Sequence, residues 1–190
     1  MEYGELNLDQ VEAIVNKLGG MEGVQRFLSG EMTIKGDLLK RVATVTVQAV
    51  TKFSAEATFG ATKPAVKLWG LGNNFKRVML GKVEEAVEAT TLTTHTLTKA
   101  SRDAPILAEL GDRAEVSLAH LWQMLLAQAN GEKGPLLTNG GWNVSYIRDA
   151  SGTLWAVAAD WDAGGGWGVD ADSVDSPYGW DAGGRVLSRE

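Results

Sequence analysis

Apolar residues at the start of the chain recur with the spacing of an α-helix. One stripe comprises Leu8, Val11, Ile14, Val15 and Leu18, and Asn7 precedes it as a capping residue. Gly19 and Gly20 end this helix, and a second short helix over residues 21–28 ends at Gly30. Residues 1–30 are therefore predicted to form a helical hairpin ahead of a main domain that spans residues 31–190.

From residue 42 the period of the pattern changes to that of a strand. The segment VATVTVQAV is β-branched and alternating, and KFSAEATF places Phe53, Ala55, Ala57 and Phe59 on one face. Two strands are predicted over residues 42–59, and the threonine-rich TLTTHTLTK predicts another over 91–99. In between, GLGNNF at 70–75 predicts a turn, followed by a short helix or an irregular segment.

Two helices are predicted in the middle of the chain. Asp103-Ala104-Pro105 is a helix-start signal and predicts a short helix over 105–110. The next helix, over 113–130, has Asp112 or Ser117 as its cap. Its apolar stripe indicates a core helix and comprises Leu118, Leu121, Trp122, Leu125, Leu126 and Ala129.

After Pro135 the pattern is one of strands and turns. The segments WNVSYIRD, TLWAVAADWD, WGVDADSV and GGRVLS alternate with turn signals. They predict an antiparallel meander over 142–188. The predicted fold class is α+β, with an N-terminal helical hairpin, a mixed middle region, and a core amphipathic helix packed on the C-terminal antiparallel β-meander.

The Trp- and Asp-rich stretch LWAVAADWDAGGGWGVDADSV, at 154–174, predicts a hairpin with one favoured register. If residues 163–165 form a three-residue loop, Trp161 faces Trp167 and Ala159 faces Val169. One face is then wholly apolar. The other face carries four carboxylates, none directly opposite another: Asp160, Asp162, Asp170 and Asp172.

This acidic face is the main candidate binding site, and its expected ligand is a basic protein partner. Carboxylates about 7 Å apart can gather a cation or a basic partner, although such a face is most often only solvated. The segment DADSVD lacks the glycine and the distal glutamate of a calcium loop. No local apolar pocket favours a carboxylate pair for glycoside hydrolysis. No catalytic residue, metal or cofactor is predicted.

Composition narrows the classes of function. The 190 residues contain no cysteine and only two histidines, His95 and His120, which excludes disulfides, thiol nucleophiles and His-rich metal centres. Both histidines are expected to be surface or structural residues. The net charge of −6 works against a general phosphate-backbone binder. The sequence shows neither a signal peptide nor a membrane-spanning run, so we expect a cytoplasmic protein with no membrane partner.

A basic segment over residues 63–82 supports an alternative function. Its cations are interleaved with Trp69 and Phe75, a pattern found on some nucleic-acid surfaces. These cations are Lys63, Lys67, Lys76, Arg77 and Lys82. Within this segment GLGNNF is not a dinucleotide loop, because Phe75 stands where the third glycine belongs.

Four segments carry a family resemblance: VEAIVNKLGGMEGVQRFLSGE, SRDAPILAELGDRAEVSLAHLWQML, GPLLTNGGWNVSYIRDASGTLWAV and GGRVLSR. They resemble a group of small proteins encoded in candidate-phyla-radiation bacterial genomes. The resemblance implies a bacterial origin and brings no activity, cofactor or catalytic residue. We predict a non-enzymatic binding or accessory protein that acts through a protein partner. A nucleic-acid-associated accessory protein is the alternative, and a small hydrolase is the third possibility; the oligomeric state stays open.

Overall fold

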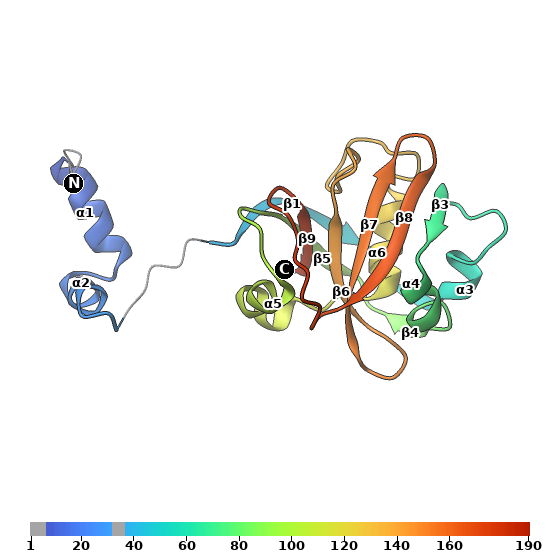
Figure 1. Ribbon diagram of the computed structural model, residues 1–190, viewed down its shortest axis with the longest axis horizontal. Helices are drawn as coiled ribbons and strands as arrows, with labels where there is room; N and C mark the ends of the chain where they lie inside the picture. The colour runs from blue at the N-terminus through green and yellow to red at the C-terminus, as the bar shows by residue number, and fades with distance from the viewer. Residues whose placement is uncertain (1–6, 32–36) are drawn as a thin grey trace. The chain divides into compact units, whose positions relative to one another are not determined.

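The computed structural model describes residues 7–31 and 37–190, and the chain divides into two units, residues 1–36 and 37–190 (Figure 1). In the first unit, α1 (Leu8–Lys17) and α2 (Met21–Leu28) are the two predicted helices. Asn7 caps α1, because its Oδ1 accepts the Gln10 N–H at 2.9 Å while Gln10 Oε1 accepts the Asn7 N–H at 3.0 Å. Gly19 and Gly20, at φ of 85° and 84°, separate the helices as predicted.

The second unit is built on a seven-stranded sheet. Its strand order is β1 (Leu39–Val47), β5 (Thr90–Leu97), β9 (Arg185–Arg189), β6 (Asn143–Arg148), β7 (Leu154–Asp162), β8 (Gly166–Ser173) and β3 (Leu68–Leu71). A separate two-stranded ladder pairs β2 (Val50–Ser54) with β4 (Val83–Val87). The helices of this unit are α3 (Ala55–Thr58), α4 (Asn73–Val78), α5 (Asp103–Leu110) and α6 (Leu118–Leu126). This mixture of helices with a large sheet confirms the α+β class.

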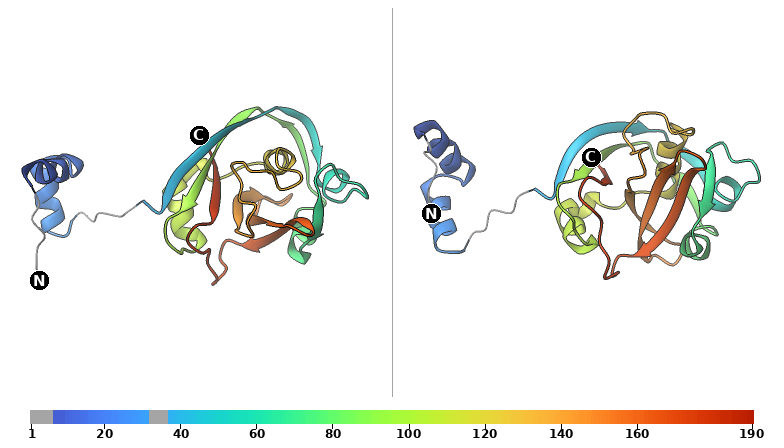
Figure 2. Two further views of the ribbon diagram at one scale, coloured as in Figure 1. Left: turned by 90° about the horizontal axis from the view of Figure 1, so that it is seen from above. Right: turned by 45° about the horizontal axis from the view of Figure 1, so that its top comes forward.

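The helix α6 lies inside the curve of the sheet (Figure 2). Seven of its nine residues are buried, and only the side that carries Gln123 and Leu126 is open to solvent. Trp122 packs edge-on against Phe59, with ring centroids 4.7 Å apart. The predicted core helix is thus confirmed, but it is shorter than 113–130. It begins after Ser117, whose Oγ accepts the His120 N–H at 3.0 Å, and residues 111–113 form a separate 3₁₀ turn.

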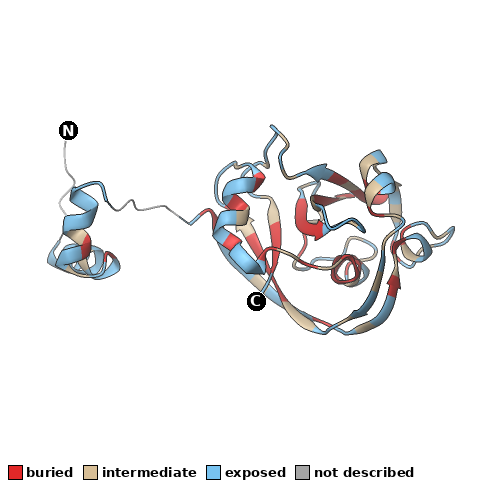
Figure 3. Cartoon of the chain, turned by 90° about the horizontal axis from the view of Figure 1, so that it is seen from below, coloured by how far each residue is buried: buried red, intermediate tan, exposed pale blue. Residues whose placement is uncertain are grey.

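A second apolar cluster lies on the opposite face of the sheet, with α5. Ile106 and Leu110 of α5 are buried in one cluster with Val144, Tyr146 and Ala156 of the strands. Much of β6 and β7 is therefore buried on both faces, which explains the continuous apolar run over residues 154–159 of β7. Figure 3 shows buried residues along α5 and along the strands that it covers.

The hairpin of β7 and β8 has the predicted register. Trp161 pairs with Trp167 and Ala159 with Val169, and residues 163–165 form the three-residue loop. The rings of Trp161 and Trp167 meet edge to face, with centroids 5.4 Å apart. Burial of both tryptophans on one face excludes the alternative register shifted by one residue.

The last strand departs from the predicted meander. Instead of following β8 at the edge, β9 inserts between β5 and β6, antiparallel to β5 and parallel to β6. The connection after β8 returns the chain toward α5, where Trp180 pairs with Ser101 in an isolated bridge. Strand propensity alone cannot distinguish an insertion of this kind from a hairpin.

Three elements of the middle region differ from the predictions. The strand predicted to extend to residue 59 ends at Ser54, because the Ser54 hydroxyl accepts the Ala57 N–H at 3.3 Å and starts α3. The segment GLGNNF is more than a turn, since β3 leads into it and α4 follows Gly72. The strand β4 lies in a segment for which no strand was predicted.

Candidate functional site

A pocket of about 460 Å³ opens where β3 and the start of α4 meet the hairpin of β7 and β8. The parallel pairing of β3 with β8 creates it, because this pairing places Gly70 beside Gly168. The pocket is lined by Trp69, Gly70, Leu71, Gly72, Asn73, Trp142, Asp160, Gly168, Val169 and Asp170. It therefore joins two residues of the predicted acidic face to two tryptophans from other parts of the chain.

Glycine backbone in the hairpin makes room for the Trp69 side chain at this pocket. A Cβ on Gly168 would lie 2.5 Å from the Trp69 indole nitrogen and 2.9 Å from Asp160 Oδ1, and a Cβ on Gly165 would lie 2.5 Å from Trp69 Cβ. The Trp69 side chain thus lies directly over glycine backbone, which a side chain at 168 would exclude. The residue remains 59% exposed, so the ring keeps an open face.

Asp160 is the carboxylate of the pocket that has no partner. It is half-buried, and no other described residue donates a hydrogen bond to its carboxylate. Burial raises the pKa of the Asp160 carboxyl above its usual value, and the negative charge of Asp162 raises it further. A carboxylate of this kind gains from a cation that replaces its lost hydration.

Asp170 has a structural task in addition to its place in the pocket. Its Oδ1 accepts the backbone N–H of Phe75 at 3.2 Å and that of Ala171 at 2.8 Å, so it caps the first turn of α4. A Cβ on Gly72 would overlap this carboxylate, at 1.9 Å from its carbon. The negative charge of Asp170 occupies the helix start at which an anion would otherwise bind.

The other two predicted acidic residues lie outside the pocket lining. Asp162 Oδ1 accepts the N–H groups of Gly164 and Gly165 at 2.9 and 2.7 Å, which fixes the hairpin loop. Asp172 is exposed, and the pKa of its carboxyl is raised by partial burial and then by the charges of Asp170 and Asp103. Of the four carboxylates, Asp160 is thus free in the pocket and Asp172 is exposed. Asp162 and Asp170 each accept backbone N–H groups and stabilise local structure.

The five residues of the predicted basic segment do not act alike. Lys63 and Lys76 are exposed, and Lys67 Nζ donates to Gly164 O at 3.2 Å. Arg77 places its guanidinium 5.4 Å from the ring centroid of Trp155, in a cation–π contact. Lys82 turns inward and is 13% exposed.

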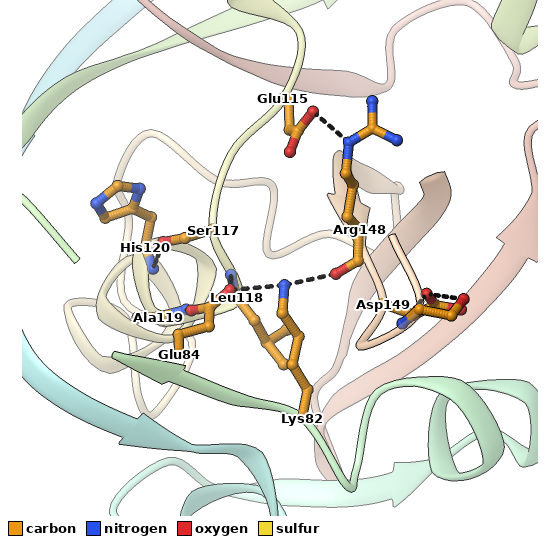
Figure 4. Close-up of polar contacts among 10 residues, drawn as sticks. Lys82, Glu84, Glu115, Ser117, Leu118, Ala119, His120, Arg148 and Asp149 are labelled. Carbon is orange, nitrogen blue, oxygen red and sulfur yellow. Dashed lines mark hydrogen bonds and ion pairs between the residues drawn. The ribbon is translucent and has the colours of Figure 1, made fainter. Parts of the chain in front are cut away.

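Lys82 belongs to a polar cluster at the start of α6 (Figure 4). Its Nζ lies 2.8 Å from Glu84 Oε1, and it donates to the backbone oxygen of Arg148. Glu84 in turn accepts the N–H groups of Leu118 and Ala119, at 2.9 and 2.8 Å. Glu84 thus caps α6 and Lys82 neutralises it, so this cluster holds the core helix in place.

A second pocket, of about 380 Å³, borders this cluster and is lined in part by Ser117, His120, Glu115 and Arg189. The His120 imidazole contacts the Glu88 carbonyl oxygen at 3.0 Å and points away from Lys82 in Figure 4. The Ser117 hydroxyl accepts the His120 backbone N–H instead of pairing with the ring. This arrangement lacks the contact between nucleophile and base that a Ser–His hydrolase needs.

Sequence reasoning missed one buried carboxylate, Asp103. Its Oδ1 accepts the Tyr146 hydroxyl at 2.8 Å and the Trp180 indole N–H at 2.7 Å. Burial raises the pKa of Asp103, and burial together with this carboxylate raises that of Tyr146. Asp103 ties α5 to the sheet and to the connection before β9. His95 is likewise structural and buried, with Nε2 3.0 Å from Ser188 Oγ.

No family model, curated protein or solved structure matches the chain. Within residues 7–31 and 37–190, no group of three or more His, Asp or Glu side chains is arranged to hold a metal ion. In the same described residues, no helix has the length and apolar character needed to cross a membrane.

Proposed function

We propose that this chain is a non-enzymatic binding protein that recognises a basic segment of a protein partner at the pocket formed by Trp69, Trp142, Asp160 and Asp170. The observation that carries the proposal is the half-buried Asp160 carboxylate, which no other described residue bonds, beside the exposed indole of Trp69. The proposal narrows the predicted acidic face to two of its four carboxylates.

The charges around the pocket support a cationic partner. Two carboxylates line it and no Lys or Arg does, and the chain carries a net charge of −6. Exposed tryptophans also attract cations through their ring faces, and Trp69 and Trp142 are 59% and 42% exposed. Long-range attraction would speed the approach of a basic segment, and the tryptophans would supply contact area once it is bound.

Two other functions have less support. Lys82 of the basic segment is paired with Glu84 and is therefore not free to bind a phosphate group. None of the other cations of this segment lines the pocket. A glycosidase needs two carboxyl groups free to act as acid and nucleophile or base. Asp170 instead bonds two backbone N–H groups. We therefore favour binding over catalysis, and the bacterial family that the sequence resembles stays a prediction.

The test compares peptides that differ in charge. A peptide with three basic residues and its counterpart with three acidic residues would be titrated into the full chain by calorimetry, at low and high salt. We expect binding of the basic peptide only, weakening as salt rises. We expect Asp160→Asn to weaken binding about tenfold or more, as for loss of a charged hydrogen bond. Equal binding of both peptides, or of parent and variant, would refute the proposal.

A further inference from the structure

The free carboxylate and the open indole of the pocket lie side by side against one glycine. Asp160 Oδ1 and the Trp69 indole nitrogen both lie within 3 Å of the position that a Cβ on Gly168 would take. In the β-ladder Asp160 is paired with Gly168, whose lack of a side chain lets the Trp69 indole lie against this glycine beside the carboxylate. A ligand in the pocket that both residues line would therefore touch an aromatic ring and a carboxylate at the same time.

Given the proposed function, on which this inference rests, we propose that the group bound in this pocket is the guanidinium of an arginine side chain. A guanidinium is planar, stacks on aromatic rings and donates two parallel N–H bonds to one carboxylate. Both surfaces that it needs are present, since Trp69 offers an open ring and no other described side chain bonds the Asp160 carboxylate. A lysine ammonium is a compact charge that cannot make both contacts with one rigid group.

The rest of the pocket fits this ligand class. Asp170 is held in place by the Phe75 and Ala171 N–H groups, so it adds a fixed negative charge without moving. Trp142 lines the pocket too and packs edge-on against Trp180, with ring centroids 6.2 Å apart. A neutral sugar would also stack on tryptophan, but it would leave the half-buried charge of Asp160 without a counter-ion.

The test uses three capped peptides, acetyl-Gly-Gly-X-Gly-Gly-amide, in which X is arginine, lysine or citrulline. Citrulline matches arginine in shape and lacks its charge. Each peptide is titrated into the full ¹⁵N-labelled chain while the shift of the Trp69 indole N–H is followed by NMR. We expect arginine to bind about tenfold more tightly than lysine, and citrulline at least tenfold more weakly than arginine, since tenfold corresponds to the loss of one charged contact.

Matched variants locate the contact. Asp160→Asn and Asp172→Asn remove the same charge from the same face, but only Asp160 lines the pocket. Asp160→Asn should abolish the preference for arginine over lysine, whereas Asp172→Asn should retain it. In calorimetric titrations, which do not need the Trp69 indole signal, Trp69→Ala should weaken arginine binding about tenfold, and Trp69→Phe should restore part of it, because a phenyl ring still stacks.

The outcomes separate this inference from the function on which it rests. If arginine and lysine peptides bind equally well and both are lost in Asp160→Asn, the basic-partner function stands and the arginine assignment is overturned. If Asp172→Asn weakens binding as much as Asp160→Asn, the face acts only by long-range attraction and the assignment also fails. If a neutral oligosaccharide shifts the Trp69 indole signal and no basic peptide does, both proposals fall.

Discussion

Replacing Glu84 by glutamine should destabilise the protein far more than replacing Glu115, although both glutamates form ion pairs. Glu84 and Lys82 are only 9% and 13% exposed, and Glu84 also accepts two backbone N–H groups at the start of α6. Glutamine keeps the shape and one acceptor oxygen, but it loses the ion pair and one of the two capping bonds. A buried donor left without a partner costs about 1–3 kcal/mol, and breaking a buried ion pair costs about 3–5 kcal/mol.

Because these two losses overlap, we expect Glu84→Gln to lower the free energy of unfolding by about 3 kcal/mol. The control is Glu115→Gln, whose pair with Arg148 at 2.9 Å is 44% and 49% exposed and should contribute less than about 1 kcal/mol. Adding Lys82→Met to Glu84→Gln should recover part of the loss, since it removes the stranded charge. Urea unfolding measures all four proteins. Equal effects of Glu84→Gln and Glu115→Gln would show that this cluster does not anchor α6.

Three further predictions follow from the core, the buried carboxylate and the basic segment. Trp122→Ala should cost about 3–5 kcal/mol in urea unfolding, while Leu126→Ala, on the exposed side of the same helix, should cost less than about 1 kcal/mol. Burial raises the pKa of Asp103 in the folded state, so the free energy of unfolding should fall as the pH rises from the pKa of this group in the unfolded state to its pKa in the folded state. Asp103→Asn should remove this contribution to the pH dependence, which urea unfolding at several pH values measures. We expect the parent protein to bind neither DNA nor RNA in gel-shift assays at about 50 mM salt, and the Lys76→Ala, Arg77→Ala double variant to behave in the same way. Strong, salt-sensitive binding by the parent that is lost in the double variant would favour the nucleic-acid alternative.

The sequence predicts most accurately the elements in which periodicity and burial agree. α6 is recognisable because its apolar residues cover most of the helix surface, and the β7–β8 register follows because only one alignment buries Trp161 with Trp167. The end of β2 is not recognisable in the same way. Phe53 and Phe59 alternate like strand residues, yet the Ser54 hydroxyl accepts the Ala57 N–H and α3 begins there. The two phenyl rings still pack together, with centroids 6.3 Å apart.

The pocket cannot be predicted from the local pattern of apolar and polar residues. β3 has four residues, two of them between or next to glycines, and nothing in LWGLG indicates that it pairs with β8 far along the chain. Trp69 therefore belongs, by sequence, to the basic segment, and Trp142 to the start of a strand. The parallel pairing of β3 with β8 brings Trp69 to the two carboxylates, and the pairing of Asn143 with Ala159 in β6 and β7 brings Trp142 to the same end of the sheet. One available signal is that both tryptophans adjoin glycines, an unusual setting for a core residue.

The hairpin shows how one alternating pattern gives four carboxylates different chemical roles. No Asp lies opposite another, and each is paired with a glycine or an alanine. The role of each carboxylate therefore depends on which other element packs against the hairpin at that position. The start of α4 approaches Asp170 and uses it as a cap. Trp69 approaches the space between Asp160 and Gly168, but its indole gives Asp160 no hydrogen bond. Of the four, Asp160 therefore combines partial burial with a free carboxylate and an aromatic neighbour, and the burial that raises its pKa also strengthens its attraction for a cation.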